Sequence, residues 1–290
     1  MFFRVLLMVL CMGSSVVFSQ QENLFVTEFK YVPSTSNTVG FQDSNVAFKY
    51  AVKLKNGSLI NGLKYTSNRV IYNDSEKLEE EPLGIELFQS IAYSLNLKKE
   101  IVNGWSYNVN IAPTVASNFE SSLTFDDFFV DGGVVFAKKF NNNTIHFGVV
   151  RNLFYGFHSP IPLITVDGAI NDNLKYSVGF PITELSYIVN NTNEFSMFVK
   201  PKGFYANIAN DLVVNVDDDV ESVQFQSFVT GLQFSHCVDD NWLIVFDAGY
   251  QLKSDYELLD KNKNSVYEFK TKNNFSAGVS LKFNLLNDKS

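Results

Sequence analysis

Apolar and polar residues alternate along several stretches of this chain. Every second residue between Trp242 and Leu252 is apolar, and the same period of two recurs from Trp105 to Ala112 and from Phe275 to Phe283. Successive side chains of a strand point to opposite faces, so each stretch has one apolar and one polar face. The pattern predicts strands that separate an apolar surrounding from a hydrated interior.

A pass along the whole chain predicts thirteen strand segments joined by connections of two kinds. Short turns of Asn, Asp or Gly alternate with longer polar connections, which is the pattern of outer-membrane barrels with short turns inside the cell envelope and long loops outside. The segments are 23–32, 45–55, 59–72, 85–97, 105–117, 128–140, 144–154, 163–170, 174–189, 194–209, 222–236, 242–253 and 270–285. The long connections are 33–44, 73–84, 118–127, 210–221 and 254–269.

The number of strands depends on Pro181. Single-chain bacterial barrels have an even number of strands, and proline is confined to strand ends, edges or bulges. Dividing 174–189 at Pro181 gives fourteen strands, whereas twelve result if one N-terminal segment lies outside the wall. The predicted fold is therefore all-β: a closed antiparallel transmembrane β-barrel of 12 or 14 strands.

The first nineteen residues have the composition of a secretory signal peptide. Arg4 is their only charge and an apolar run from Val5 to Met12 follows, too short to cross a bilayer as a helix. We predict two parts, a signal peptide over 1–19 and a barrel over 20–290. Cys237 is the only cysteine left after cleavage, so the mature chain forms no internal disulfide.

Composition and charge narrow the class of partner. The net charge is −8 without a basic cluster, which argues against nucleic acid. Aromatic residues make up 15% of the chain, more than ordinary usage, and suit lipid-facing strands. Trp105 and Trp242 each open a strand after a short turn, so we expect both in the inner interfacial girdle. The expected location is the outer membrane, with its lipids and the barrel-insertion machinery as partners.

Two stretches resemble a known family. They run from Pro160 to Tyr187 and from Val199 to Tyr205. The likeness is carried by Gly179, Phe180, Pro181, Tyr187, Pro201 and Gly203. The chain resembles the uncharacterised outer-membrane β-barrel proteins of Bacteroidota that are grouped under a domain of unknown function. The resemblance implies an outer-membrane barrel and no activity, so it transfers no catalytic or binding residue.

Catalytic and metal-binding motifs are absent from the sequence. His146, His158 and His236 are the only histidines, and a hydrolase would need His158 or His236 beside a Ser or Asp. Acidic runs at 74–81 and 217–219 lack the spacing of a calcium loop and are expected to be solvated loops. We therefore predict no enzyme activity, no cofactor and no metal.

The polar phase of the strands is expected to line the lumen. The lumen-facing candidates are Lys49, Lys53, Asn108, Asn110, Asp247, Gln251 and Lys282. Such an interior suits a pore or ligand tunnel for a small solute, or a structural surface barrel closed by salt bridges. Small barrels are filled by side chains and large ones leave a channel, and a barrel of 12 or 14 strands lies between these sizes. An open lumen and a closed lumen are therefore both possible. A barrel-embedded hydrolase and a soluble periplasmic sandwich are the remaining alternatives.

Overall fold

A computed structural model describes residues 24–35, 38–72, 84–215 and 218–284. The predicted signal peptide and the acidic run 74–81 lie outside the described residues. The strands are β1 (Phe25–Val32), β2 (Gly40–Leu54), β3 (Gly57–Ile71), β4 (Leu87–Glu100), β5 (Trp105–Ser117), β6 (Phe128–Phe140), β7 (Asn143–Arg151), β8 (Ile161–Ala169), β9 (Leu174–Phe180), β10 (Thr183–Ile188), β11 (Asn193–Asn215), β12 (Asp218–Cys237), β13 (Trp242–Leu259), β14 (Ser265–Phe269) and β15 (Phe275–Phe283). Two 3₁₀ turns are η1 (Phe125–Asp127) and η2 (Leu153–Tyr155).

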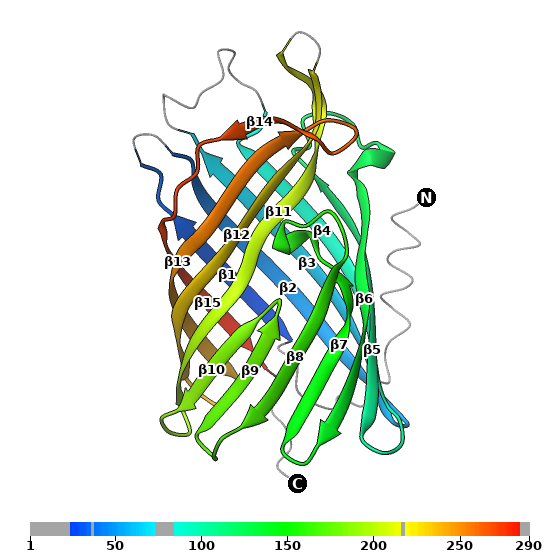
Figure 1. Cartoon of the computed structure of the whole chain (residues 1–290), viewed down its shortest axis with the longest axis vertical. Helices are drawn as coiled ribbons and strands as arrows, with labels where there is room; N and C mark the ends of the chain where they lie inside the picture. Colours follow the sequence, from blue (N-terminus) through cyan, green and yellow to red (C-terminus); the bar gives the residue numbers. More distant parts are fainter. Residues whose placement is uncertain (1–23, 36–37, 73–83, 216–217, 285–290) are drawn as a thin grey trace.

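The strands form one closed antiparallel barrel (Figure 1). Consecutive strands pair from β1 to β13, β13 then pairs with β15, and β15 pairs with β1. β14 pairs only with the upper part of β13, so fourteen strands make up the described wall. The prediction of a closed barrel is confirmed with fourteen strands, and the alternatives of twelve strands and of a sandwich are wrong. Pro181 does divide the ninth segment, because β9 ends at Phe180 and β10 begins at Thr183.

The two ends of the barrel differ in their connections. The lower end in Figure 1 carries the short turns and the end of β15, and the upper end carries the longer connections. Asn103 and Asn141 have positive φ at two lower turns, a conformation that asparagine tolerates better than most residues. Much of the predicted loops 210–221 and 254–269 is instead strand, because β11, β12 and β13 continue far past the other strands.

The outer face of the wall is apolar. On neighbouring strands the large apolar side chains fall on the same outward phase, as the pairing of Phe48 with Leu63 illustrates. Half or more of the side chain is exposed at Phe48, Leu63, Ile91, Ile111, Phe246 and others. Contiguous exposed apolar surface of this kind marks a contact with a partner or a membrane.

The wall is uneven in height. β7, β8, β9 and β10 are short, and β10 stops pairing with β11 at Val199. β11 continues upward and meets β5 directly, in a parallel bridge between Asn207 and Ser117. The upper part of the barrel is therefore bounded by β1 to β6 and β11 to β13, without the four short strands (Figure 1).

An apolar core fills this narrowed upper part. Phe41 stacks on Phe225 with ring centroids 3.9 Å apart, and Tyr256 stacks on Phe269 at 4.8 Å. These four side chains are at most 2% exposed, although they come from strands far apart in the sequence. The expected hydrated interior thus does not extend to the upper end. No helix among the described residues is long and apolar enough to cross a membrane.

Candidate functional site

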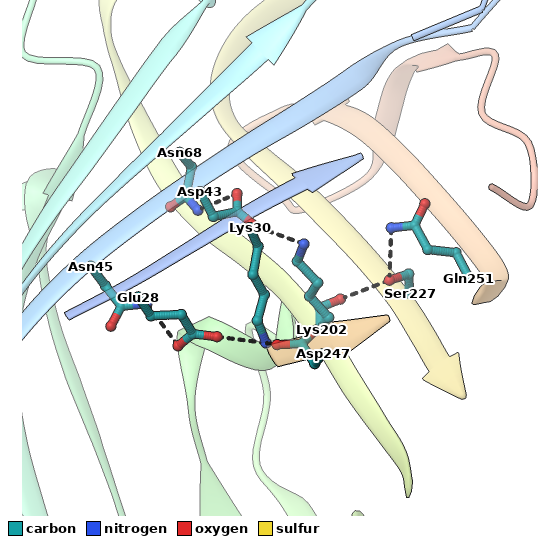
Figure 2. A network of polar contacts seen from close by, with 9 residues as sticks. All are labelled: Glu28, Lys30, Asp43, Asn45, Asn68, Lys202, Ser227, Asp247 and Gln251. Carbon is teal, nitrogen blue, oxygen red and sulfur yellow. Dashed lines mark hydrogen bonds and ion pairs between the residues drawn. The ribbon is translucent and has the colours of Figure 1, made fainter. Parts of the chain in front are cut away.

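An ion-pair network fills one side of the barrel interior below the apolar core. Lys30 of β1 lies 2.6 Å from Glu28 and 3.7 Å from Asp247 of β13. Asn45 of β2 donates a hydrogen bond to Glu28 at 3.1 Å. Glu28, Lys30 and Asp247 all have most of their side-chain surface buried, so each charge is held by a partner (Figure 2).

A second pair extends the network towards β11 and β12. Lys202 of β11 lies 2.7 Å from Asp43 of β2, which also accepts a hydrogen bond from Asn68 at 3.0 Å. Ser227 of β12 donates to the backbone carbonyl of Lys202, and Gln251 of β13 donates to Ser227 (Figure 2). The interior beside β1, β2 and β11 to β13 is consequently packed with paired polar side chains.

The opposite side of the interior is open. A lower cavity of about 800 Å³ is lined by residues of β3 to β11 and reaches Pro181 at the β9–β10 turn. An upper cavity of about 380 Å³ lies against β2 to β8, and the two share lining residues such as Asn96, Asn108 and Tyr155. The shared lining makes them neighbouring parts of one luminal space.

The connection from β7 to β8 folds into the barrel above this space (Figure 1). We call residues 152–160 the plug segment. The Leu153 amide donates to Asp131 Oδ2 of β6 at 3.1 Å, while the Leu153 side chain belongs to the apolar core. Arg151 donates to the carbonyls of His158 (3.0 Å) and Val130 (2.7 Å), which ties the plug segment to β6.

The far end of the plug segment is attached to β11 and β12. Gln226 of β12 donates to the Gly156 carbonyl at 2.9 Å. Gly156 has φ of +78°, and a Cβ there would lie 1.9 Å from the Phe225 carbonyl oxygen, so only glycine fits. A Cβ on Gly203 of β11 would likewise meet Gly156 at 2.9 Å. The plug segment therefore spans the lumen from one wall to the other.

Aromatic side chains of the plug segment line the cavities from above. The Phe154 ring lies 3.5 Å from Lys64 Nζ, a cation–π contact with β3. Tyr155 lines both cavities. Burial raises the pKa of the Tyr155 phenol, and the hydrogen bond with Asn152 lowers it by less. The hydroxyl consequently stays protonated and can donate to a solute.

Charged side chains line the cavities on two sides. Lys49, Lys64 and Lys98 come from β2, β3 and β4 respectively. Glu184 of β10 and Glu194 of β11 line the lower cavity, where Ser186 donates to Glu184 at 3.0 Å. Two further carboxylates are Asp131 and Asp167, and the latter lies 3.0 Å from His146. Two further cations are Arg151 and Lys175.

Within the part of the chain that the structure describes, three buried acceptor atoms of the cavity lining have no hydrogen-bond partner. They are Asn96 Oδ1, Asp131 Oδ1 and Asp167 Oδ1. Asp131 is only 5% exposed. Buried polar atoms are normally paired, so these acceptors are available to water or to a solute that donates a hydrogen bond.

The structure separates the seven lumen-facing candidates into three groups. Lys49, Asn108 and Asn110 line the cavities. Asp247 and Gln251 are buried in the filled side instead, where they contact Lys30 and Ser227. The remaining two are Lys53 and Lys282, which share the inward strand phase without reaching either cavity lining.

Both tryptophans begin strands at the lower end. Trp105 is 38% exposed, with its ring edge-on to Phe147 at 6.1 Å and Lys138 Nζ 5.2 Å from its ring. Trp242 packs against Phe283 at 4.8 Å, on the outward phase of β13 and β15. Their common level is the geometry that an interfacial girdle would need.

The histidine contacts that a hydrolase would need are not formed by His158 or His236 in the described part of the chain. His158 Nδ1 lies 2.8 Å from Gln224 Oε1, and His236 Nδ1 lies 2.8 Å from Asn193 Oδ1. Neither contact brings a Ser or Asp to the imidazole, so the pair that the hydrolase alternative needs is not formed there. Within the described ranges, no group of three metal-ligating side chains comes together.

Several residues of the site were missed from the sequence. Residues 152–154 were predicted as the end of the strand 144–154, which is wrong because β7 ends at Arg151, and residues 155–160 were predicted as a connection. Phe154, Tyr155 and Phe157 around Gly156 are nevertheless an aromatic cluster unusual for a solvated loop. Lys64, Asp131, Arg151, Glu184 and Glu194 were missed because single polar residues on a strand do not reveal which of them meet across the lumen.

Comparison with solved structures finds a porin and a transporter at very low sequence identity. The NanC porin matches with a TM-score of 0.42 and 8% identity over 90% of this chain and 100% of that one. The toluene transporter TodX of P. putida matches with a TM-score of 0.41 and 8% identity over 93% of this chain and 91% of that one. No curated protein matches the sequence.

A family model matches residues 66–285, which includes both stretches on which the resemblance rests. A family of unknown function is thereby confirmed, while an origin in Bacteroidota stays a prediction. The chain belongs to the family described as "Domain of unknown function (DUF6268)".

Proposed function

We propose that this chain is an integral outer-membrane barrel that admits small polar solutes from its lower end and passes them when the plug segment shifts. The luminal cavity carries the proposal, because about 800 Å³ of space lined by charged and amide side chains lies inside a wall that is apolar outside. Charges cost several kcal/mol on the lipid face of a barrel, which supports a hydrated lumen here. The predicted signal peptide supports export.

The plug segment would control the upper route. Above it the apolar core occupies the barrel, and beside it the strands β7 to β10 are short. Arg151 links the His158 carbonyl of the segment to the Val130 carbonyl of β6, and these contacts can break without disturbing a strand pairing. A shift of residues 152–160 would therefore enlarge the passage while the wall stays closed.

A structural or surface-interaction barrel is the second candidate. The filled upper end and the ion-pair network favour it, because both resemble the permanent packing expected of a closed lumen. The two candidates differ in one measurable property, which is conductance.

Planar-bilayer recording of the purified chain tests the proposal. We expect small discrete conductance steps in the wild type and larger steps in Arg151→Ala, whose plug segment loses the link through His158 and keeps the Leu153–Asp131 hydrogen bond to β6. Lys49→Glu should shift ion selectivity towards cations, because Lys49 lines the upper cavity. Lys55→Glu is the matched control, since it makes the same charge change at an exposed turn between β2 and β3.

Silence in both the wild type and Arg151→Ala, with stable insertion shown by protease resistance, would overturn the pore and favour the structural barrel. Equal selectivity shifts in Lys49→Glu and Lys55→Glu would show that ions do not pass Lys49.

A further inference from the structure

The charged residues of the luminal cavity lie on strands that face each other across the barrel. In a ring of fourteen strands, a strand is opposite the one seven positions away, so β3 faces β10 and β4 faces β11. Lys98 of β4 lines the lower cavity together with Glu184 of β10 and Glu194 of β11, whereas Lys64 of β3 lines the upper cavity. Figure 1 agrees, because β3 and β4 form the back of the barrel and β10 and β11 the front.

The total charge of the lining is nearly balanced. Five cationic and four carboxylate side chains line the two cavities, so the lumen as a whole attracts neither anions nor cations strongly. The cationic side chains are Lys49, Lys64, Lys98, Arg151 and Lys175, and the carboxylates are Asp131, Asp167, Glu184 and Glu194. Lys175 and Asp131 are exceptions to the separation, because Lys175 lies on β9 beside the acidic strands and Asp131 lines the upper cavity with Lys49 and Lys64.

Separated charges of opposite sign create a field across the lumen. Low-dielectric walls around a narrow aqueous space focus such a field. A solute with a single charge is attracted by one wall and repelled by the other. A solute with an ammonium and a carboxylate at opposite ends is attracted by both walls. The unpaired acceptors Asp131 Oδ1, Asn96 Oδ1 and Asp167 Oδ1 are suited to the N–H groups of such a solute.

We infer that the luminal cavity selects small zwitterionic solutes, which lie across the lower cavity with the carboxylate towards Lys98 and the ammonium towards Glu184 and Glu194. The inference rests on the proposed function and names its solute class. Solutes of the size of a dipeptide, with charges at both termini, have the required chemistry.

Uptake of four matched dipeptides into proteoliposomes tests the inference. The probes are alanylalanine (zwitterion), N-acetyl-alanylalanine (anion), alanylalanine amide (cation) and N-acetyl-alanylalanine amide (neutral), measured at pH 7 with the full chain. We expect alanylalanine to enter roughly tenfold faster than each blocked peptide, a ratio that corresponds to about 1.4 kcal/mol.

Substitutions test whether Glu184, Glu194 and Lys98 cause the preference for the zwitterion. Glu184→Gln with Glu194→Gln keeps the shape of both side chains and removes their charge, so the preference should move from the zwitterion to the anion. Lys98→Gln should raise uptake of the cation. Asp172→Asn, in the exposed β8–β9 turn, is the matched control and should leave all four rates unchanged.

The two proposals fail in different ways. Uptake of all four peptides at equal rates would overturn the zwitterion inference and leave solute passage intact. A preference that survives in the double glutamate variant would also overturn it. No uptake of any peptide, including in Arg151→Ala, would overturn the proposed function itself.

Discussion

The two sides of the barrel interior are built from the same alternating strands and differ in what fills them. Beside β1, β2 and β11 to β13, inward side chains meet partners in the ion-pair network and in the apolar core above it. Beside β3 to β10, the inward side chains surround the luminal cavity, and three acceptors have no partner. The difference shows that polar alternation alone does not decide whether a lumen is packed or open.

Strand height accounts for much of the contrast. The tall strands β11, β12 and β13 bring rings such as Phe225 and Tyr256 to the upper end, where they pack on Phe41 from β2. The short strands β7 to β10 end before that level, and the plug segment lies over the space above them. Packing on the first side stabilises the fold, and the lack of packing on the second leaves room for a solute.

The largest effect is expected from opening the apolar core. Phe225→Ala removes a ring that is 1% exposed and stacked on Phe41, so it should lower the free energy of unfolding by about 3–5 kcal/mol. Urea titration of the folded barrel in detergent micelles measures the change. A loss below about 1 kcal/mol would mean that the upper end is not tightly packed, and the comparison between the two sides would fail.

A slightly smaller effect is expected in the ion-pair network. Asp43→Ala leaves Lys202 without its carboxylate in a mostly buried position, which should cost about 3 kcal/mol. Adding Lys202→Met removes the unpaired charge, so the double variant should regain most of this loss. The same urea titration compares the single and double variants. If the double variant is as destabilised as Asp43→Ala, the loss of stability does not come from an unpaired charge on Lys202.

The smallest stability effect is expected on the open side. Asn108→Leu places a similar-sized apolar side chain in the cavity lining, where no packed neighbour is lost, so stability should change by less than about 0.5 kcal/mol. Conductance should fall, because the passage loses a polar group. A destabilisation as large as that of Phe225→Ala would indicate that this side is packed as well.

Much of the fold was predictable, and particular residues show why. The dyad repeat at Trp105 and Trp242 placed strands and their two faces, and Pro181 marked the division of the ninth segment that makes fourteen strands. Lys49, Asn108 and Asn110 were predicted to face the lumen, and they line the cavities. Asp247 and Gln251 share the same phase and are buried with partners, because β11, β12 and β13 pack closely around them.

The sequence by itself determined the strands, their inward and outward faces and the closure of the sheet, because these follow from a local period of two and from the need to pair every edge. Only the tertiary structure decided which inward residues meet. The plug segment, the apolar core and the facing charges of Lys98 and Glu194 depend on contacts between strands up to half a barrel apart. Such contacts depend on the height of each strand and on the number of strands in the barrel. Neither property can be predicted from the sequence of a single strand.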